Sequence, residues 1–478
     1  MANTSLKKNV FFNVIRSVVA LLFPLITFPY ASRILLPSGI GKVNFVNNII
    51  SYFTLIANLG ISTYAIREAA KRRENKDDLS CFFKEIFVLH IVSTLIAYLL
   101  FLIAFFFVPK LQSYQTLLLL ASVTIIFSTF EIDWLYIAEE NFAYITLRSI
   151  IFQGLSLIFL FLLVKTKEDI LWYLFLSVFC SVGTNIVNFI HSYTHIAFRK
   201  KHILHPLQHV KPLIIFFAMV LITSVYMLLD NSMLGFLSSD EQVGFYSSAT
   251  KLNKMVVTLI TAVTGVILPR LSIYSEKGKN DEVIRLFNKG LSYVCFISIP
   301  CAVGLSLLSR PLTLFFSGTH YIPAIFTMQL MTPIIFFISI SGFIGVQFFT
   351  PLKKERWTLI SVAIGAVINF SLNIIFIPRY GAFGAGIASV FAESAVTMVQ
   401  IIIARKCIHK KQQCMVIFKC LISCTIMGLG VLFCLKYIQN IVLQIVLSIL
   451  AGTFLYGFSS VLFQNKPAKE LLTIIKKV

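Results

Sequence analysis

Apolar runs of 18 or more residues recur from one end of this chain to the other, and they limit its fold more than any other feature. A helix of about 20 residues crosses ~30 Å of hydrocarbon, and only helices or closed barrels satisfy their backbone hydrogen bonds there. Of the 478 residues, 58% are hydrophobic and 13% are charged, whereas soluble domains carry about 25% charged residues. The sequence therefore predicts an all-α integral membrane protein.

The apolar runs divide into fourteen candidate transmembrane helices, and their ends are defined to within about four residues. The predicted spans are 10–30, 42–62, 86–108, 115–137, 144–164, 171–192, 213–233, 243–267, 288–310, 322–348, 357–377, 381–404, 415–437 and 441–463. An even number of spans predicts that both termini lie on one side of the membrane.

The basic residues of the connections predict which side that is. Connections after even-numbered spans are rich in Lys and Arg, as in Arg72-Arg73 and Lys200-Lys201, whereas those after odd-numbered spans hold isolated charges such as Lys110. Cytoplasmic loops carry an excess of Lys and Arg, so both termini are expected in the cytoplasm. The same rule explains the net charge of +21, and nucleic acid is not an expected partner.

A weak internal repeat predicts how the spans are grouped. Ile40-Gly41 and Val243-Gly244 open two spans 203 residues apart, and Gly60 and Gly265 lie near the ends of those spans, 205 residues apart. Two six-helix lobes whose first helices both start on the cytoplasmic side would be parallel repeats. We therefore expect two lobes around a central cavity, followed by an appended helix pair with a basic tail. These three parts are residues 1–200, 201–410 and 411–478.

Several segments of the sequence carry a family resemblance as a set. They are FPYASRIL from Phe28, GIGKVNF from Gly39, GISTYAIREAA from Gly60, DWLYIAEENF from Asp133 together with Arg148, LPRLS from Leu268, and the stretch from Asn369 to Glu393. Over spans 1 to 12 the chain resembles the bacterial polysaccharide repeat-unit flippases of the multidrug/oligosaccharidyl-lipid/polysaccharide exporter superfamily. The resemblance implies fourteen helices in two lobes, and an oligosaccharide on a polyprenyl diphosphate as the substrate.

The function expected from this resemblance is transport. The protein would flip polyprenyl-diphosphate-linked oligosaccharide repeat units to the outer leaflet of the bacterial plasma (inner) membrane by alternating access, with or without cation coupling. Its partners would be the lipid bilayer and the glycan polymerase and glycosyltransferases of the same pathway. A cation-coupled multidrug exporter and a membrane-embedded glycan polymerase are the alternatives. No enzymatic activity, catalytic residue or cofactor is expected.

Basic residues inside the spans are the first candidates for substrate binding, because an anionic head group needs a wet, cationic cavity. Lys251 and Lys254 lie deep in span 243–267 and share one helix face. Arg16 and Arg148 lie in the cytoplasmic halves of spans 10–30 and 144–164. A structural role competes with substrate binding at each of these positions.

Four further residues are candidates for contacts with the head group. Arg33 and Lys42 lie near the outer ends of their spans, where snorkelling to the lipid head groups is the alternative. Asn369 and Asn373 share a face of span 357–377, and they bind either sugar hydroxyls or a neighbouring helix.

Three carboxylates are candidates for cation coupling, because a buried carboxylate can take up and release a proton as its surroundings change. Glu393 lies near the middle of span 381–404, where a permanent salt bridge to Lys251 or Lys254 is the alternative. Asp133 lies beside Trp134 near the end of its span, where solvation at the interface competes. Asp230, near the outer end of span 213–233, fits either role.

Five histidines follow one another at metal-ligand-like spacings near the end of span 171–192. They are His191, His195, His202, His205 and His209. No cysteine or carboxylate of the sequence pattern joins them, and the adjacent Arg199-Lys200-Lys201 would repel a cation. We therefore expect no metal site.

Overall fold

The computed structural model describes residues 6–198 and 203–475, and within these ranges the chain forms helices and no strand. The chain divides into two compact units, Met1–Phe236 and Leu237–Val478. The predicted division into residues 1–200, 201–410 and 411–478 follows the repeat and the topology rather than contacts, and it stays a prediction.

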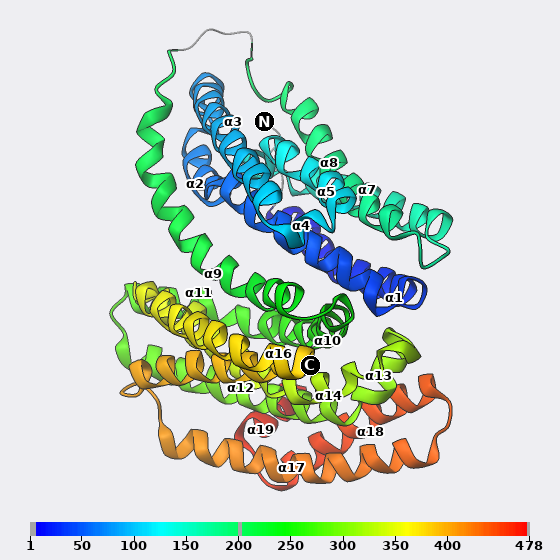
Figure 1. Ribbon diagram of the computed structural model, residues 1–478. Helices are drawn as coiled ribbons and strands as arrows, with labels where there is room; N and C mark the ends of the chain where they lie inside the picture. Colours follow the sequence, from blue (N-terminus) through cyan, green and yellow to red (C-terminus); the bar gives the residue numbers. More distant parts are fainter. Residues whose placement is uncertain (1–5, 199–202, 476–478) are drawn as a thin grey trace. The chain divides into compact units, whose positions relative to one another are not determined.

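The first unit contains the helices that hold the N-terminal predicted spans (Figure 1). Its elements are α1 (Leu6–Asn58), α2 (Ile61–Arg72), α3 (Lys76–Phe107), α4 (Pro109–Gln112), α5 (Gln115–Phe127), the 3-10 turn η1 (Ser128–Phe130), α6 (Asp133–Ala138), α7 (Phe142–Leu163), α8 (Ile170–Ser192), the 3-10 turn η2 (Pro206–His209) and α9 (Val210–Leu237). An aromatic cluster that includes Phe82, Phe83 and Trp134 joins α2, α3 and α6.

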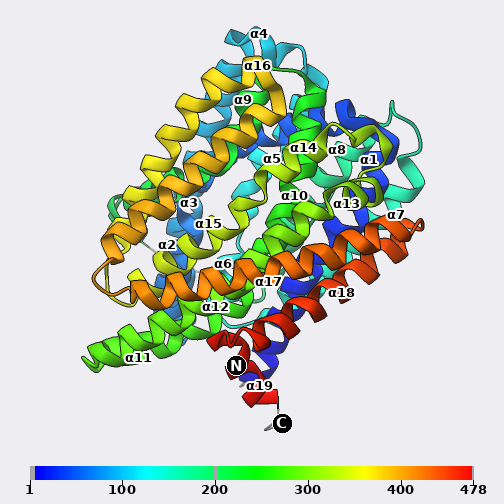
Figure 2. The same cartoon turned by 90° about the horizontal axis from the view of Figure 1, so that it is seen from below.

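The second unit holds the remaining helices. They are α10 (Asp240–Thr264), the 3-10 turn η3 (Gly265–Ile267), α11 (Leu268–Glu276), α12 (Asn280–Leu307), α13 (Ser309–Phe316), the 3-10 turn η4 (Thr319–Tyr321), α14 (Ala324–Met331), α15 (Pro333–Gly342), the π-helical η5 (Phe343–Phe349), α16 (Glu355–Ala404), α17 (Lys410–Tyr437), α18 (Ile441–Leu462) and α19 (Lys466–Ile475). The helices α17 and α18 lie side by side, and α17 packs on α12. Figure 2 shows the short α19 beside the end of α18.

The helices confirm a multi-pass, all-α membrane protein. Within the described ranges, ten helices are long and apolar enough to cross a membrane, or up to twelve if each of two bent pairs forms one span. Two of the ten helices are longer than one crossing requires: α1 has 53 residues and α16 has 50, which correspond to about 80 and 75 Å. The count of fourteen spans stays a prediction.

Each of these long helices contains one residue with non-helical backbone angles. These residues are Leu36 in α1 and Gly381 in α16, with φ of 61° and 55°. Both breaks lie at junctions between predicted spans, 10–30 with 42–62 and 357–377 with 381–404. Each long helix is therefore two helical segments joined without a loop.

The break in α16 requires glycine for two reasons. Left-handed backbone angles cost a residue with a Cβ about 1–2 kcal/mol, and a Cβ at Gly381 would lie 2.4 Å from Oε1 of Gln242. That oxygen accepts a hydrogen bond from the backbone N–H of Ala382 at 2.8 Å. Gln242 of α10 thus satisfies a donor that the break removes from the helical pattern.

Candidate functional site

The first unit contains a polar cavity with a volume of about 650 Å³. Segments of α1, α5, η1, α8 and α9 line it, and twelve of its seventeen lining residues are polar. The polar residues are Asn47, Ser51, Thr54, Asn58, Thr124, Ser128, Glu131, Ser177, Ser181, Asn185, Thr223 and Ser224. Hydroxyls and amides both donate and accept hydrogen bonds, so this lining suits a ligand rich in hydroxyl groups.

Glu131 is the one carboxylate of this lining, and it is held by a chain of polar groups. The Nδ2 group of Asn58 donates to Oε2 of Glu131 at 3.1 Å, and Oδ1 of Asn58 lies 3.2 Å from Nε2 of His90. An amide oxygen only accepts, so Nε2 of His90 is the donor in this arrangement. Three elements, α1, α3 and the segment after η1, thereby fix the carboxylate at the cavity wall.

Asn58, His90 and Glu131 were not among the predicted site residues. A sequence signal for them exists, because Asn58 and His90 lie inside apolar runs and Glu131 follows one. Polar residues at such positions usually face a cavity or a neighbouring helix.

A second polar cluster of the first unit brings together three predicted site residues, Arg16, Arg148 and Asp133. Nη1 of Arg148 lies 3.0 Å from Oδ1 of Asp133, and Nη2 lies 3.4 Å from Oδ2, which is a bidentate arrangement. Nη2 of Arg16 lies 3.9 Å from Oδ2 of the same carboxylate. Two guanidinium groups and one carboxylate give this cluster a formal charge of +1.

Asn188 completes this cluster from α8. Its side chain accepts a hydrogen bond from Arg148 and donates one to Asp133, and Asn188 is fully buried. Arg148 is 7% exposed, whereas the side chain of Arg16 is 35% exposed. Arg148 is therefore part of a buried network, while Arg16 remains accessible at its edge.

The other predicted site residues of the first unit lie apart from this cluster. Arg33 is exposed and Lys42 is half-buried, and both belong to α1 close to the break at Leu36. Asp230 is half-buried on α9.

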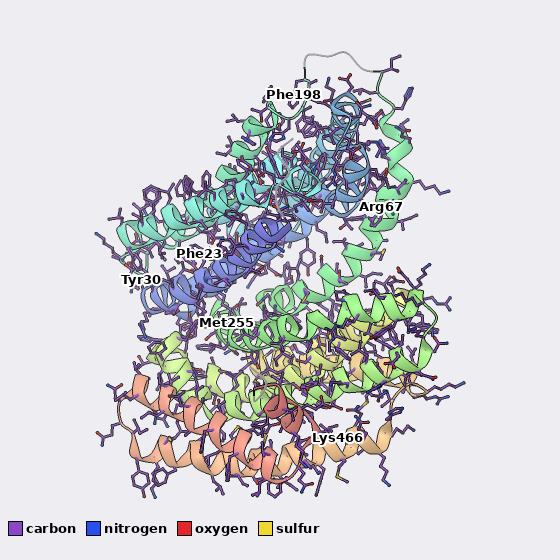
Figure 3. All side chains as sticks on the ribbon, turned by 180° about the vertical axis from the view of Figure 1, so that it is seen from behind. Phe23, Tyr30, Arg67, Phe198, Met255 and Lys466 are labelled. Atoms are coloured by element: carbon purple, nitrogen blue, oxygen red, sulfur yellow. The ribbon has the colours of Figure 1, made fainter. Side chains whose placement is uncertain are left out.

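The second unit holds the two lysines that the sequence singled out. Both belong to α10; Lys251 is half-buried and Lys254 is exposed. Met255, which Figure 3 labels, follows Lys254 directly in the chain. Of the two lysines, Lys254 is therefore the more exposed.

The remaining predicted residues belong to α16, on either side of its break. Asn369 and Asn373 are 1% and 0% exposed, and Nδ2 of Asn373 donates to Oδ1 of Asn369 at 2.9 Å. The two side chains therefore share a helix face, as their spacing predicts, and on that face they are hydrogen-bonded to each other. Glu393 lies in the second segment of α16 and is half-buried.

The histidines take separate structural partners. The ring of His191 stacks on Tyr144 with centroids 4.0 Å apart, and Nδ1 of His195 lies 2.7 Å from Oε2 of Glu139. Nε2 of His209 lies 2.9 Å from Oε2 of Glu85. His202 lies outside the described residues. In the part of the chain that the structure describes, no group of His, Cys, Asp and Glu is placed to hold a metal ion.

The fold belongs to a class known from solved transporter structures. It is similar to "Lipid II flippase MurJ, inward closed conformation", with a TM-score of 0.76 and 18% identity over 97% of this chain and 100% of that one. It is also similar to the inward-facing conformation of a multidrug resistance MATE family transporter of the MOP superfamily. In that case the TM-score is 0.64, with 13% identity over 83% of this chain and 97% of the other.

The sequence assigns the chain to a family within this class. Residues 6–275, more than half of the chain, match the family described as "Polysaccharide biosynthesis protein", and the protein belongs to this family. It is 25% identical to the "Putative O-antigen transporter" of Escherichia coli (strain K12), over 84% of this chain and 97% of that protein. It is 23% identical to the "Probable low-salt glycan biosynthesis flippase Agl15" of Haloferax volcanii, over 51% of this chain and 52% of that protein.

Proposed function

We propose that the protein flips polyprenyl-diphosphate-linked oligosaccharide repeat units from the cytoplasmic to the outer leaflet of the bacterial plasma membrane by alternating access. Family membership and relatives named as an O-antigen transporter and a glycan biosynthesis flippase support this proposal. The observation that carries it is the cavity of about 650 Å³ whose lining is mainly hydroxyls and amides. Because its relatives are named as transporters and flippases, the protein is a transporter and not an enzyme.

The chemistry of the substrate explains why such a cavity is needed. A hydroxyl moved from water into an apolar environment without a hydrogen bond costs roughly 2–7 kcal/mol, and each sugar of a repeat unit carries several hydroxyls. The serine, threonine and asparagine side chains of the cavity replace water as hydrogen-bond partners. The lipid tail needs no such replacement, because it remains in hydrocarbon.

The diphosphate needs cations, and basic side chains inside or beside the predicted spans supply them in our proposal. Lys251 and Lys254 of α10 are the main candidates, and Arg16, Arg33 and Lys42 add positive charge from α1. Arg148 acts through Asp133 and Asn188, with which it forms the buried network. Asn369 and Asn373 hold each other and remain candidates for sugar contacts.

Cation coupling, orientation and pathway partners belong to the same proposal. Glu393, Asp230 and Asp133 are the proposed coupling carboxylates, and Asp133 already neutralises part of the charge of two arginines. The charges of the connections support cytoplasmic termini. The glycan polymerase and the glycosyltransferases of the pathway are the proposed protein partners.

A multidrug exporter is the second candidate, since the MATE fold is similar. A cationic drug favours an acidic binding site, whereas the cavity lining of the first unit consists mainly of hydroxyls and amides, with Glu131 as its one acid. A neutral, hydroxyl-rich ligand fits this lining better. A glycan polymerase is less well supported because the relatives are named for transport.

Complementation with a cavity variant tests the proposal. A strain that lacks the gene is given wild type, Ser181→Leu or Ser371→Leu, and surface polysaccharide and lipid-linked repeat units are measured at equal membrane levels of protein. Both serines are exposed on helices, but only Ser181 lines the cavity. We expect Ser181→Leu to lose surface polysaccharide and accumulate repeat units, and Ser371→Leu to behave as wild type. Drug sensitivity without a polysaccharide defect would instead favour the exporter.

A further inference from the structure

A basic pocket of about 570 Å³ lies in the second unit, and none of the residues assigned to transport above lines it. The first turns of α17 and the junction of α18 with α19 form it. The described residues that line it include four lysines and no carboxylate, and the lysines are Lys410, Lys411, Lys419 and Lys466. Such a lining favours an anion.

The pocket wall is built by specific contacts between the two helix ends. Nζ of Lys419 donates to the carbonyl oxygen of Gln464 at 3.2 Å, which ties α17 to the turn after α18. The backbone N–H of Asn465 donates to the carbonyl of Ser460 at 2.9 Å. Lys410, Lys411 and Lys466 are exposed, so their ammonium groups are accessible to a bound molecule. Figure 3 labels Lys466 at the start of α19.

Asn465 gives the pocket a second, independent indication of a ligand. It is 0% exposed, and its Nδ2 donates to Sγ of Cys420 at 3.3 Å. Its Oδ1 has no hydrogen-bond partner among the described residues, and an unsatisfied buried acceptor costs about 1–3 kcal/mol. Because Asn465 belongs to the pocket lining, this oxygen marks a position for a donor group of the ligand.

The surroundings of the pocket indicate that the anion belongs to a lipid. Met415 and Phe418 on α17 and Leu462 at the end of α18 are 50%, 60% and 64% exposed, so apolar surface that suits hydrocarbon adjoins the lysines. The pocket also follows the connection that carries Arg405 and Lys406, which loop charges predict to be cytoplasmic. Basic pockets at this boundary bind anionic lipid head groups.

We propose that this pocket binds the head group of an anionic phospholipid of the cytoplasmic leaflet. The ammonium groups of Lys410, Lys411 and Lys466 hold the phosphate by charge-assisted hydrogen bonds. A hydroxyl of the head group donates to Oδ1 of Asn465, so a glycerol head group is preferred over a bare phosphate. The acyl chains lie along the apolar surface that includes Phe418. This site is independent of the transported substrate.

Native mass spectrometry of the purified full-length protein in detergent tests the lysines. The ligands are phosphatidylglycerol, phosphatidic acid and phosphatidylcholine with identical short acyl chains, and glycerol phosphate serves as the soluble control. The test variant is Lys410→Gln/Lys411→Gln/Lys466→Gln. The matched control, Lys277→Gln/Lys279→Gln/Lys354→Gln, removes three exposed lysines of the same unit that do not line the pocket.

We expect wild type and the control to bind phosphatidylglycerol well and phosphatidylcholine poorly. The test variant should bind phosphatidylglycerol about 100-fold more weakly, on the order of fivefold per lysine. Replacing the same three lysines by arginine should restore binding. Equal losses in the test and control variants, equal binding of phosphatidylcholine, or equally tight binding of glycerol phosphate would each overturn the proposal.

Asn465→Leu tests the hydroxyl contact separately. We expect wild type to prefer phosphatidylglycerol over phosphatidic acid, and Asn465→Leu to lose that preference while still binding phosphatidic acid. An unchanged preference in a variant with the wild-type Tm overturns the role of Asn465. If the variant does not fold, Asn465→Ala, which removes the acceptor without adding bulk, gives the same comparison.

Discussion

The carboxylate of Glu85 lies 2.9 Å from Nε2 of His209, although 124 positions separate the two residues in the chain. The hydroxyl of Tyr64 lies 2.7 Å from Nδ1 of the same ring, and the backbone N–H of His205 donates to Oε1 of Glu85 at 2.7 Å. The side chains of Glu85 and His209 are each 6% exposed. This buried network fixes the start of α9 to α2 and α3.

We predict that Glu85→Ala destabilises the protein by about 3 kcal/mol, because removing one member of a buried pair leaves the other without its partner. The backbone N–H of His205 loses its acceptor as well. The Tm of the purified protein measures the effect. Glu276→Ala, at an exposed position on α11, is the control and should change the Tm little. A similar Tm for both variants would mean that the network adds no stability.

The bidentate pair of Arg148 and Asp133 leads to a second prediction. Arg148→Ala should lower both membrane abundance and transport, because it leaves Asp133 and the buried Asn188 without their common partner. Arg148→Lys should rescue only part of the loss, since an ammonium group does not reproduce the guanidinium fork. A double-mutant cycle with Asp133→Ala measures the coupling, which we expect at about 1–3 kcal/mol.

Arg16→Ala is the matched comparison for that cycle. Its guanidinium is 3.9 Å from Asp133 and its side chain is 35% exposed, so its coupling to Asp133 should be below about 1 kcal/mol. Equal coupling energies for Arg16 and Arg148 would contradict the difference in burial and geometry that separates them.

Lys254 provides the test of the cationic part of the transport proposal. In a deletion strain, Lys254→Arg should restore surface polysaccharide, whereas Lys254→Ala should reduce it at least tenfold at equal membrane levels, because an anionic diphosphate needs a positive charge on its path. If Lys254→Ala restores surface polysaccharide fully, this exposed residue of α10 does not bind the substrate. The flippase function could still stand in that case.

Two substitutions of Glu131 test whether this residue of the polar cavity acts through hydrogen bonds or through its charge. If the carboxylate serves sugar hydroxyls, Glu131→Gln should keep transport within a few-fold of wild type, because an amide still donates and accepts. Glu131→Leu should lose transport at least tenfold and leave Asn58 without its acceptor. A loss with Glu131→Gln as large as that with Glu131→Leu would show that the charge is required, and would make Glu131 a coupling residue.

The break in α16 gives a prediction about stability. Gly381→Ala should destabilise the protein by about 2 kcal/mol or more, because its φ of 55° disfavours a Cβ and that Cβ would lie 2.4 Å from Gln242. Gly457→Ala on α18 is the control, since a Cβ there meets nothing within 4 Å, and it should be neutral or stabilising. The Tm of the two variants decides the matter.

The sequence predicts those features that depend on a residue and its near neighbours. The apolar runs locate the membrane helices, the break in α16 falls at Gly381, and Asn369 and Asn373 share the face that their spacing predicts. The family resemblance, built on short segments, agrees with the matched family.

The polar networks of the first unit could not be predicted from the sequence pattern. Arg148, Asp133 and Asn188 come from α7, α6 and α8, and pairing between helices depends on how each helix is rotated about its axis. In membrane helices that are apolar on most sides, hydrophobic periodicity does not report this rotation. The histidines illustrate the same limit, since neighbours in sequence contact Tyr144, Glu139 and Glu85 on different elements.

The loopless breaks in α1 and α16 have a practical consequence for topology mapping. Tags, protease sites and reporter fusions are tolerated where backbone is exposed and few hydrogen bonds are lost. An insertion at Leu36 or Gly381 would separate two helical segments that meet directly, and at Gly381 it would displace Gln242 from the N–H of Ala382. The connection at 164–169, between α7 and α8, is the better position for an epitope, because residues 165–168 are exposed.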